Sequence, residues 1–298
     1  MRFASGILAL SGLVLLAPLA HAEEYVKAYS VTGRATVRVR VDDSNVRVIS
    51  SDAPKVEFRV TYEGYELGKS LFIESRQEGS DVELTAREKT GLTIGYRNRR
   101  VSTEVHVPRD ADLQLETGDG AIELAAMNGR ISVRSGDGSI RAARLNGTIE
   151  LTTSDGDIRA EGLKGDVRMR TGDGRVDATG LDGKCSAGSG DGLITLAGRF
   201  DSLDVTTGDG GVTARVGAGS AMSGSWHIRS GDGPVELVLP SDFKATVEAS
   251  TGDGRITMGL PITTQGDLGK SRVRGTLNGG GPALVLRTGD GPIRIHAN

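Results

Sequence analysis

Residues Thr117 to Arg215 read TGDGAIELA AMNGRISVR SGDGSIRAA RLNGTIELT TSDGDIRAE GLKGDVRMR TGDGRVDAT GLDGKCSAG SGDGLITLA GRFDSLDVT TGDGGVTAR. The spaces divide this region into eleven segments of nine residues, and every second segment carries Asp-Gly at its third and fourth places. A fixed period of this kind is typical of an array in which each repeat stacks on its neighbour. The aspartates that mark the 18-residue period are Asp119, Asp137, Asp155, Asp173, Asp191 and Asp209.

The sixth and eighth places of each segment are apolar, with mostly polar or small residues between them. The sixth place runs from Ile122 to Val212 without an exception, and the eighth is Leu, Val, Met or Ala. Apolar residues two apart are typical of a half-buried β-strand. The sequence therefore predicts an all-β protein. We expect a single-chain β-solenoid, a flattened β-helix or β-roll, with 18-residue coils made of two nine-residue halves.

Glycine occupies the fourth place in ten of the eleven segments, and Asp201 is the exception. Asp-Gly and Asn-Gly turns need positive φ angles, which glycine adopts without steric conflict, so we expect a tight turn at each of these places. A left-handed hexapeptide helix also uses 18 residues per coil. It would place an aliphatic residue every six positions, whereas here the aliphatic residues come every nine, so that alternative is excluded.

The same motif continues beyond Arg215 with looser spacing, at Asp232, Asp253 and Asp290. The repeat β-solenoid is therefore expected over residues 117–298. Within it, residues 261–281 lack the pattern and predict an irregular loop before a final coil at residues 283–295.

Residues 23–116 do not follow the nine-residue rhythm but alternate apolar and polar residues, as in Val101-Ser-Thr-Glu-Val-His-Val107. This segment predicts either a β-rich N-terminal cap or wider coils of the same solenoid. A cap is expected because an open terminal coil would present unpaired strand edges.

Residues 1–22 have the features of a signal peptide. Arg2 is followed by an apolar run, and Ala20-His21-Ala22 has the small-x-small form of a cleavage site. The sequence thus predicts export to the periplasm, the cell surface or the extracellular space, with no transmembrane segment after signal removal. No cysteine comes directly after the signal, where Glu23 stands, so we expect no lipid anchor.

The charge balance is mild. The chain has 36 Lys+Arg and 39 Asp+Glu, and removal of Arg2 leaves 35 − 39 = −4. Nucleic acids and anionic membranes select strongly basic surfaces, so neither is the expected partner. The single cysteine, Cys185, excludes an intramolecular disulfide and occupies a sixth place, which predicts a buried, unreactive thiol.

The aspartate column is the one candidate site with a regular pattern. Stacked coils would set successive carboxylates about 4.8 Å apart. We expect each carboxylate to fold back onto the amides of its own turn; the alternative is a row of divalent cations, with calcium as the candidate cofactor. That candidate cation row consists of Asp119, Asp137, Asp155, Asp173, Asp191 and Asp209. Otherwise we assign no catalytic, cofactor-binding or metal-ligating residue.

The remaining candidates are more ordinary. The hydroxyl residues that precede these turns, Thr117 to Thr207, predict a turn-capping ladder. The histidines lack metal-ligand spacing, and only His227 beside Trp226 has the character of a site. The basic cluster Tyr96-Arg-Asn-Arg-Arg100 is expected to be solvated, with contact to an acidic polysaccharide or lipid headgroup as the alternative.

The run from Thr103-Glu-Val-His-Val-Pro108 through Asp112-Leu-Gln-Leu-Glu-Thr117 resembles the exported bacterial β-strand-repeat family labelled "putative adhesin". Gly279-Gly-Gly-Pro282 and the later Arg287-Thr-Gly-Asp-Gly-Pro-Ile293 match its C-terminal end. The resemblance implies a β-solenoid in the cell envelope or outside the cell and assigns no functional residues. The calcium-binding nonapeptides of RTX proteins are similar in period, but their sixth-place aspartate ligand is replaced here by apolar residues.

Taken together, these features predict a non-enzymatic exported protein, either an adhesin or a cell-envelope interaction or scaffold protein. Its expected partner is an unidentified envelope or extracellular protein or polysaccharide. The alternative is a carbohydrate-active β-helix enzyme such as a polysaccharide lyase. Such an enzyme usually needs long loops with clustered acids and bases, whereas these repeats are nearly free of loops.

Overall fold

The computed structural model describes residues 22–89, 99–264 and 269–298, and every regular element in them is a β-strand. The strands form one 25-stranded sheet with both parallel and antiparallel pairs, which confirms the all-β prediction. No helix within these residues is long and apolar enough to cross a membrane. Of the expected signal, residues 1–22, only Ala22 lies inside the described residues.

The strands follow one another along the chain with short connections. The N-terminal strands are β1 (Glu23–Ser30), β2 (Ala35–Val41), β3 (Asn45–Ser51), β4 (Lys55–Glu63), β5 (Leu71–Glu78), β6 (Asp81–Glu88) and β7 (Arg100–Pro108). The repeat region contains β8 (Ala111–Thr117), β9 (Ile122–Ala125), β10 (Asn128–Ser135), β11 (Ile140–Ala143), β12 (Asn146–Thr153), β13 (Ile158–Glu161), β14 (Lys164–Arg170), β15 (Val176–Ser189), β16 (Ile194–Thr207) and β17 (Val212–Val216). The C-terminal strands are β18 (Trp226–Ser230), β19 (Val235–Leu239), β20 (Ala245–Thr251), β21 (Ile256–Gly259), β22 (Thr263–Thr264), β23 (Arg272–Leu277), β24 (Ala283–Thr288) and β25 (Ile293–Ala297).

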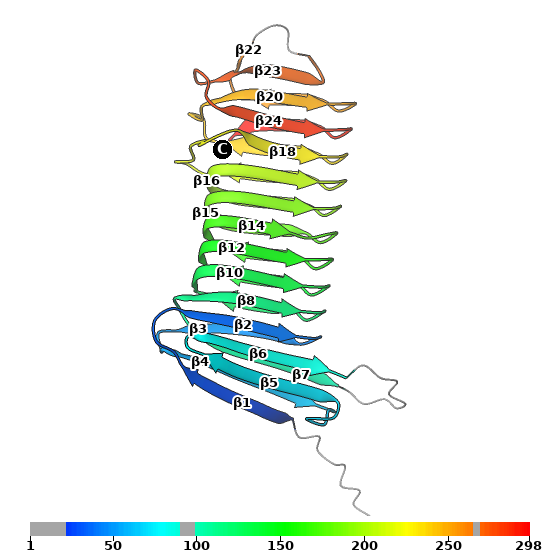
Figure 1. Cartoon of the computed structure of the whole chain (residues 1–298). Coiled ribbons are helices and arrows are strands. Elements are labelled where there is room, and N and C mark those ends of the chain that lie inside the picture. Colours follow the sequence, from blue (N-terminus) through cyan, green and yellow to red (C-terminus); the bar gives the residue numbers. More distant parts are fainter. Residues whose placement is uncertain (1–21, 90–98, 265–268) are drawn as a thin grey trace, which may run out of the picture.

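The repeat region is a stack of parallel strands, seen side-on in Figure 1. We call a rung the two strand segments on either side of one turn at the aspartate edge, such as β10 and β11 on either side of Gly136-Asp137-Gly138. From β8 to β17, most residues of a rung pair with the residue 18 positions later in the next rung, as Ile131 does with Ile149 and Ile140 with Ile158. The register therefore stacks equivalent places of the repeat directly on one another.

Strands on the same side of the turns stack into a column, so the stack has two columns, one that contains β8, β10 and β12 and one that contains β9, β11 and β13. The core lies between these two columns. The sixth-place residues are buried from Ile122 at 0% exposure to Val212 at 1%, and the eighth-place residues are buried with them. Burial of a large apolar side chain stabilises a fold by about 1.5–3 kcal/mol. Each rung buries only a few such side chains, so it is stable only when it is stacked on neighbouring rungs. The predicted inward and outward faces are confirmed.

The pairing of β15 with β16 departs from the ideal register twice, between Ala178 and Leu181 and again at the place where Asp201 replaces glycine. β15 and β16 pair with a shift between Gly183 and Lys184, where Phe200 and Ser202 are the partners, so Asp201 is an extra residue. Bulged residues leave the ladder and need other partners. Asp201 finds one in Arg199, whose Nη1 donates to Asp201 Oδ1 at 2.6 Å.

The N-terminal end combines parallel and antiparallel strands. β2 and β3 form a rung beneath β8 and β9, with Val37 paired to Leu113 and Val46 to Ile122. β6 and β7 lie in parallel below that rung, and β1, β4 and β5 run antiparallel to their partners. The hydroxyl of Tyr25 on β1 lies 2.7 Å from Ser75 Oγ on β5, which links the last strands of the two columns.

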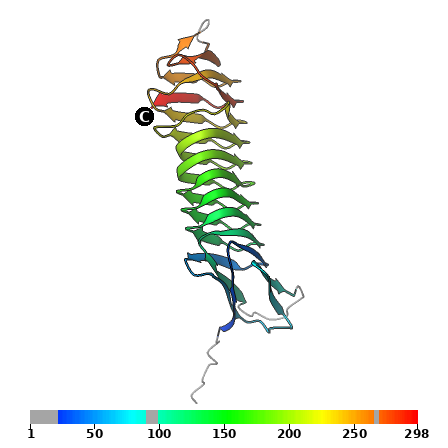
Figure 2. The same cartoon turned by 60° about the vertical axis from the view of Figure 1, so that its left-hand side comes forward.

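At the C-terminal end, the order of the rungs in space differs from their order in the sequence. β24 lies between β18 and β20, because Leu284 pairs with both Trp226 and Val247. β25 likewise lies between β19 and β21. Figure 2 shows this rung, in red, between the yellow and orange strands. The coil expected at residues 283–295 is therefore present but is not the last one of the stack, because rungs that share one pattern can align in any order.

The predicted loop at residues 261–281 is also only partly irregular. It contains β22 and β23, and β23 pairs antiparallel with β20 over Ala245 to Ser250. This strand covers the outer edge of β20, which would otherwise be the open end of one column. The antiparallel arrangement at both ends explains why these segments lack the nine-residue rhythm.

Candidate functional site

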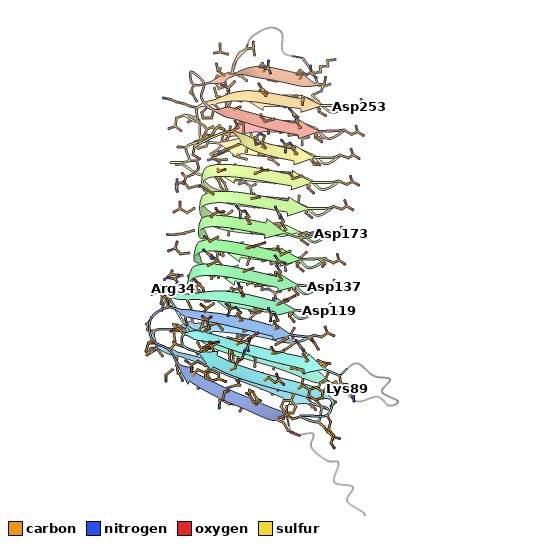
Figure 3. All side chains as sticks on the ribbon, in the orientation of Figure 1. Arg34, Lys89, Asp119, Asp137, Asp173 and Asp253 are labelled. Carbon is orange, nitrogen blue, oxygen red and sulfur yellow. The ribbon has the colours of Figure 1, made fainter. Side chains whose placement is uncertain are left out.

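The aspartates of the turns lie above one another along one edge of the stack. Figure 3 shows Asp119, Asp137, Asp173 and Asp253 at this edge, and all of the turn aspartates are exposed. Within the described residues, the six central carboxylates accept no hydrogen bond from their own turns, so the expected fold-back onto these amides is wrong. No group of three or more metal-binding side chains occurs in that part of the chain. The cation row stays a prediction.

The turns are held instead by the buried hydroxyl column. Thr153 Oγ1 donates to Gly136 O at 2.8 Å and to Gly138 O at 3.0 Å in the rung below, while the amide of Gly156 donates to Thr153 Oγ1 at 3.3 Å. The same arrangement recurs from Ser135 to Thr288. The predicted turn-capping ladder is confirmed, and it binds each turn to the turn beneath it.

The glycines of the Asp-Gly pairs serve a different purpose from the one expected. Positive φ occurs at the glycines of the other segments, such as Gly147 at 131°, but not at Gly156. A Cβ atom at Gly156 would lie 2.2 Å from the carbonyl oxygen of Gly138 in the rung below. Close approach of stacked backbones, rather than φ, therefore requires glycine in the Asp-Gly turns.

The single cysteine is a core residue. Cys185 has 4% exposure, and burial raises the pKa of its thiol to about 12. A thiolate is the reactive form of cysteine, so this side chain is unreactive in the folded protein. The predicted buried thiol is confirmed.

The side chains of Trp226 and His227 point to opposite faces of β18. Trp226 is fully buried and packs edge-on against Phe200, with ring centroids 6.2 Å apart, whereas His227 lies on the outward face of β18. Adjacent residues of a strand point to opposite faces, so this pair forms no site. Of the other histidines, His296 Nε2 lies 3.0 Å from Glu236 Oε1 at the surface.

Most of the basic cluster Tyr96-Arg-Asn-Arg-Arg100 lies outside the described residues, which exclude residues 90–98. Of the two arginines that are described, Arg99 lies over the ring of Tyr65 with its Cζ 5.1 Å from the centroid, a cation–π contact. The prediction of a solvated cluster is not tested by the described residues.

A groove of about 690 Å³ opens on the outward face of β3, β9, β11, β13 and the first part of β15. It crosses stacked strands of successive rungs and therefore runs along the axis of the stack rather than along any one strand. An open furrow of this form suits an extended ligand better than a compact one.

One row of charged side chains follows the groove. Arg47, Glu123, Arg141, Arg159 and Asp177 occupy paired positions on consecutive strands, so they form one outward column. Glu123 lies within ion-pair distance of both arginine neighbours, at 3.2 Å from Arg47 and 3.8 Å from Arg141. These pairs are half-exposed, and such surface pairs contribute only about 0–1 kcal/mol each. Because these ion pairs are weak, their side chains can instead form ion pairs with charged groups of a ligand.

The hollow itself comes from small side chains in the next outward column. Ala125 and Ala143 pair with each other there, between Ile49 on one side and Glu161 on the other. Two alanines beside a row of arginine and glutamate side chains leave an apolar floor. Sequence reasoning missed this groove, although alanine at the ninth place of two consecutive odd segments could have indicated it.

The corner beside the groove holds strained backbone. Ala126 and Arg144 have positive φ angles of 58° and 53°, in the same corner position as Gly162 at 66°. A left-handed conformation costs a residue with a Cβ atom about 1–2 kcal/mol. Arg144 lines the groove and forms no ion pair within the described residues. Strain at a residue that faces a groove is consistent with a binding role.

Ion pairs also link rungs on the other column. Arg34 Nε lies 3.0 Å from Asp112 Oδ1. The amide of Arg130 donates to the same Asp112 oxygen at 2.9 Å, and this bond, with the Arg34 guanidinium, lowers the pKa of the Asp112 carboxyl. Such contacts tie three rungs together and account for the shift without a catalytic role.

Comparisons with known proteins give distant similarity. A structure described as a putative lipid binding protein from Parabacteroides distasonis has 14% identity, covers 93% of this chain and 98% of its own, and gives a TM-score of 0.43. A putative adhesin from the same species has 11% identity, coverage of 93% and 98%, and a TM-score of 0.41. A putative adhesin from Parabacteroides merdae has 10% identity, coverage of 92% and 96%, and a TM-score of 0.38. No curated protein matches the chain.

The family comparison is more decisive. The model of the Toastrack DUF4097 family matches residues 35–296, from β2 to β25, the last strand in the sequence. This match spans both the regular rungs and the permuted C-terminal end. The chain therefore belongs to the Toastrack DUF4097 family.

Proposed function

We propose that this chain is a β-solenoid with 18-residue coils of two nine-residue halves, preceded by a β-rich cap and exported from the cytoplasm. The register of 18 residues between successive parallel strands supports the coil length. The features of residues 1–22 support export to the periplasm or beyond it.

The proposed function is non-enzymatic binding of an extended partner in the cell envelope or outside the cell, as an adhesin or an envelope scaffold. The groove along β3, β9, β11, β13 and β15 is the observation that carries this proposal. Its row of exchangeable charges and its alanine floor would contact an elongated polysaccharide or protein segment over several rungs.

The location can be tested by protease treatment of intact cells, with a known periplasmic protein as a control. Digestion of this chain while the control survives would support a surface adhesin. Protection until the outer membrane is breached would contradict the adhesin function and leave a periplasmic scaffold.

The groove can be tested with the purified protein. Replacement of Ala143 by Trp should fill the groove from an outward position and reduce binding to cell-wall or matrix extracts at least tenfold. The matched control is Thr195→Trp, which lies outward on β16 beyond the groove. Equal binding by both variants would contradict the proposed site.

The alternative function, a polysaccharide lyase, predicts a different result. A lyase acting on uronic-acid polymers would release unsaturated products that absorb ultraviolet light. We expect no such absorbance with the wild-type protein, and its appearance would contradict the non-enzymatic proposal.

A further inference from the structure

A row of arginines crosses the C-terminal end of the stack, on the column opposite the groove. Arg229 on β18 pairs in register with Arg287 on β24, Arg287 pairs with Ser250 on β20, and Ser250 pairs with Arg272 on β23. Directly paired residues on one face of a sheet have Cβ atoms about 4.5–5.5 Å apart. The row therefore reads Arg229, Arg287, Ser250 and Arg272 across the four neighbouring strands labelled in Figure 1.

Within the described residues, this row lacks compensating charge. The three arginines are exposed, and none has a carboxylate within ion-pair distance among the residues that the structure describes. Its neighbour Arg274, in the adjacent column, is already paired with Glu248 at 2.9 Å. Like charges directly opposite each other on a sheet are destabilising. The adjacent Arg229 and Arg287 therefore weaken the fold unless an anion lies between them.

Arg287, Ser250 and Arg272 of this row border a hollow, whereas Arg229 lies outside its lining. A cavity of about 500 Å³ is lined by Arg272, Arg274, Arg287, Ser250 and Glu248. Guanidinium groups present several donors in a planar fork, which matches the oxygens of phosphate and carboxylate groups, and the serine hydroxyl adds a further donor. The hollow thus combines several donors with a net positive charge.

We propose that this row is a binding site for a phosphate-bearing ligand, with Arg287, Ser250 and Arg272 in the hollow holding a phosphate group and Arg229, paired with Arg287, extending the contact. The site depends on the permuted order of the rungs, because only the insertion of β24 places Arg287 between Arg229 and Ser250. The mild net charge of the chain does not reveal it, since these arginines are far apart in the sequence and are brought together only by strand pairing.

The test is calorimetric titration of the full exported chain with sodium tripolyphosphate at low and at moderate salt. The variant is Arg229→Gln combined with Arg287→Gln. The matched control is Arg294→Gln, because Arg294 lies on β25 of the same inserted rung, is exposed, and belongs to the other column. We expect equal binding by the wild type and the control, and binding at least tenfold weaker by the double variant.

Thermal unfolding supplies a second readout that a purely structural role would not give. Without ligand, the double variant should unfold at the same or a higher temperature than the wild type, because a like-charge contact is removed. Tripolyphosphate should raise the unfolding temperature of the wild type and of Arg294→Gln, but not that of the double variant. Absence of binding by the wild type, or equal binding by the double variant, would overturn the proposal.

A sedimentation assay with the same variants distinguishes a lipid headgroup from a soluble phosphate compound as the ligand. Vesicles that contain phosphatidylglycerol are compared with vesicles of phosphatidylcholine alone by sedimentation. Sedimentation of the wild type but not of the double variant with the anionic vesicles would support a lipid headgroup. Binding of tripolyphosphate without sedimentation would support a soluble or polymer-borne phosphate.

Discussion

The central rungs and the C-terminal rungs are built from one repeat but assembled differently. Between β8 and β17, each rung lies beside the rungs that precede and follow it in the sequence. At the C-terminal end, residues 283–297 lie between residues 226–239 and 245–259. The repeat therefore specifies which side chains face inward and which places align, but it does not specify which rung is the neighbour.

The largest effect is expected in the central rungs. Ile149→Asp in β12 places a carboxylate among fully buried side chains, and an unpaired buried charge should destabilise the protein by more than about 4 kcal/mol. Loss of cooperative thermal unfolding, followed by circular dichroism, is the measurement. Ile149→Val is the control and should cost about 0.5–1.5 kcal/mol. A wild-type melting curve for Ile149→Asp would contradict the described core.

The equivalent change in the inserted rung should have a smaller effect. Leu286 in β24 is as buried as Ile149, but Leu286→Asp should release residues 283–297 while the central rungs stay folded. Trp226 and Val247 both pair with Leu284, so the two flanking rungs keep a compatible register. Hydrogen exchange should show fast exchange of residues 283–297 only. Global unfolding like that of Ile149→Asp would show that both regions form one cooperative unit.

Glycine substitutions sharpen the comparison further. Gly156→Ala should cost about 1–3 kcal/mol by overpacking against Gly138, and Gly254→Ala should cost a similar amount because its Cβ would lie 2.1 Å from Gly291 O. Gly162→Ala meets nothing closer than 3.9 Å and should cost only about 1 kcal/mol for its positive φ. Urea unfolding measures all three. Tolerance of Gly254→Ala alone would contradict the permuted order.

A pH-dependent effect is expected from Cys185. Burial raises the pKa of its thiol to about 12, so the stability that comes from the neutral thiol is complete below the unfolded pKa of about 8.5. It is lost as the pH rises toward 12, by up to about 1.4 kcal/mol per pH unit. Urea unfolding between pH 8.5 and 10.5 should show a steeper decline for the wild type than for Cys185→Val. Parallel declines would exclude this thiol as the cause.

The smallest effect is expected from divalent cations at the aspartate edge. The carboxylates are exposed, and the described residues form no metal-binding group around them. Excess EDTA followed by calcium should therefore leave the thermal midpoint unchanged. A midpoint that rises with calcium concentration would support the cation row, because a ligand that binds only the folded state stabilises it.

Much of the fold was predictable because the repeat pattern depends on residues close together in the sequence. The sixth-place positions of Ile122 and Ile140 identified the core, and the hydroxyls identified the turn caps. The position of β24 was not predictable, since any rung of this pattern can align with any other. The groove depends on Ala125 and Ala143 lying in one column, and the arginine row depends on residues far apart in the sequence. Both require the pairing of strands, which periodicity alone does not give.

The inserted rung also constrains the time order of folding. A chain is synthesised from its N-terminus, so the central rungs can form in sequence as they emerge. Residues 245–259 emerge before residues 283–297, yet they reach their final neighbours only after the later segment has arrived. Until then, the upper edge of residues 226–239 lacks its native partner, and open strand edges promote association between chains. Completion of this end therefore waits for the synthesis of residues 283–297, and the open strand edge persists until they have been inserted.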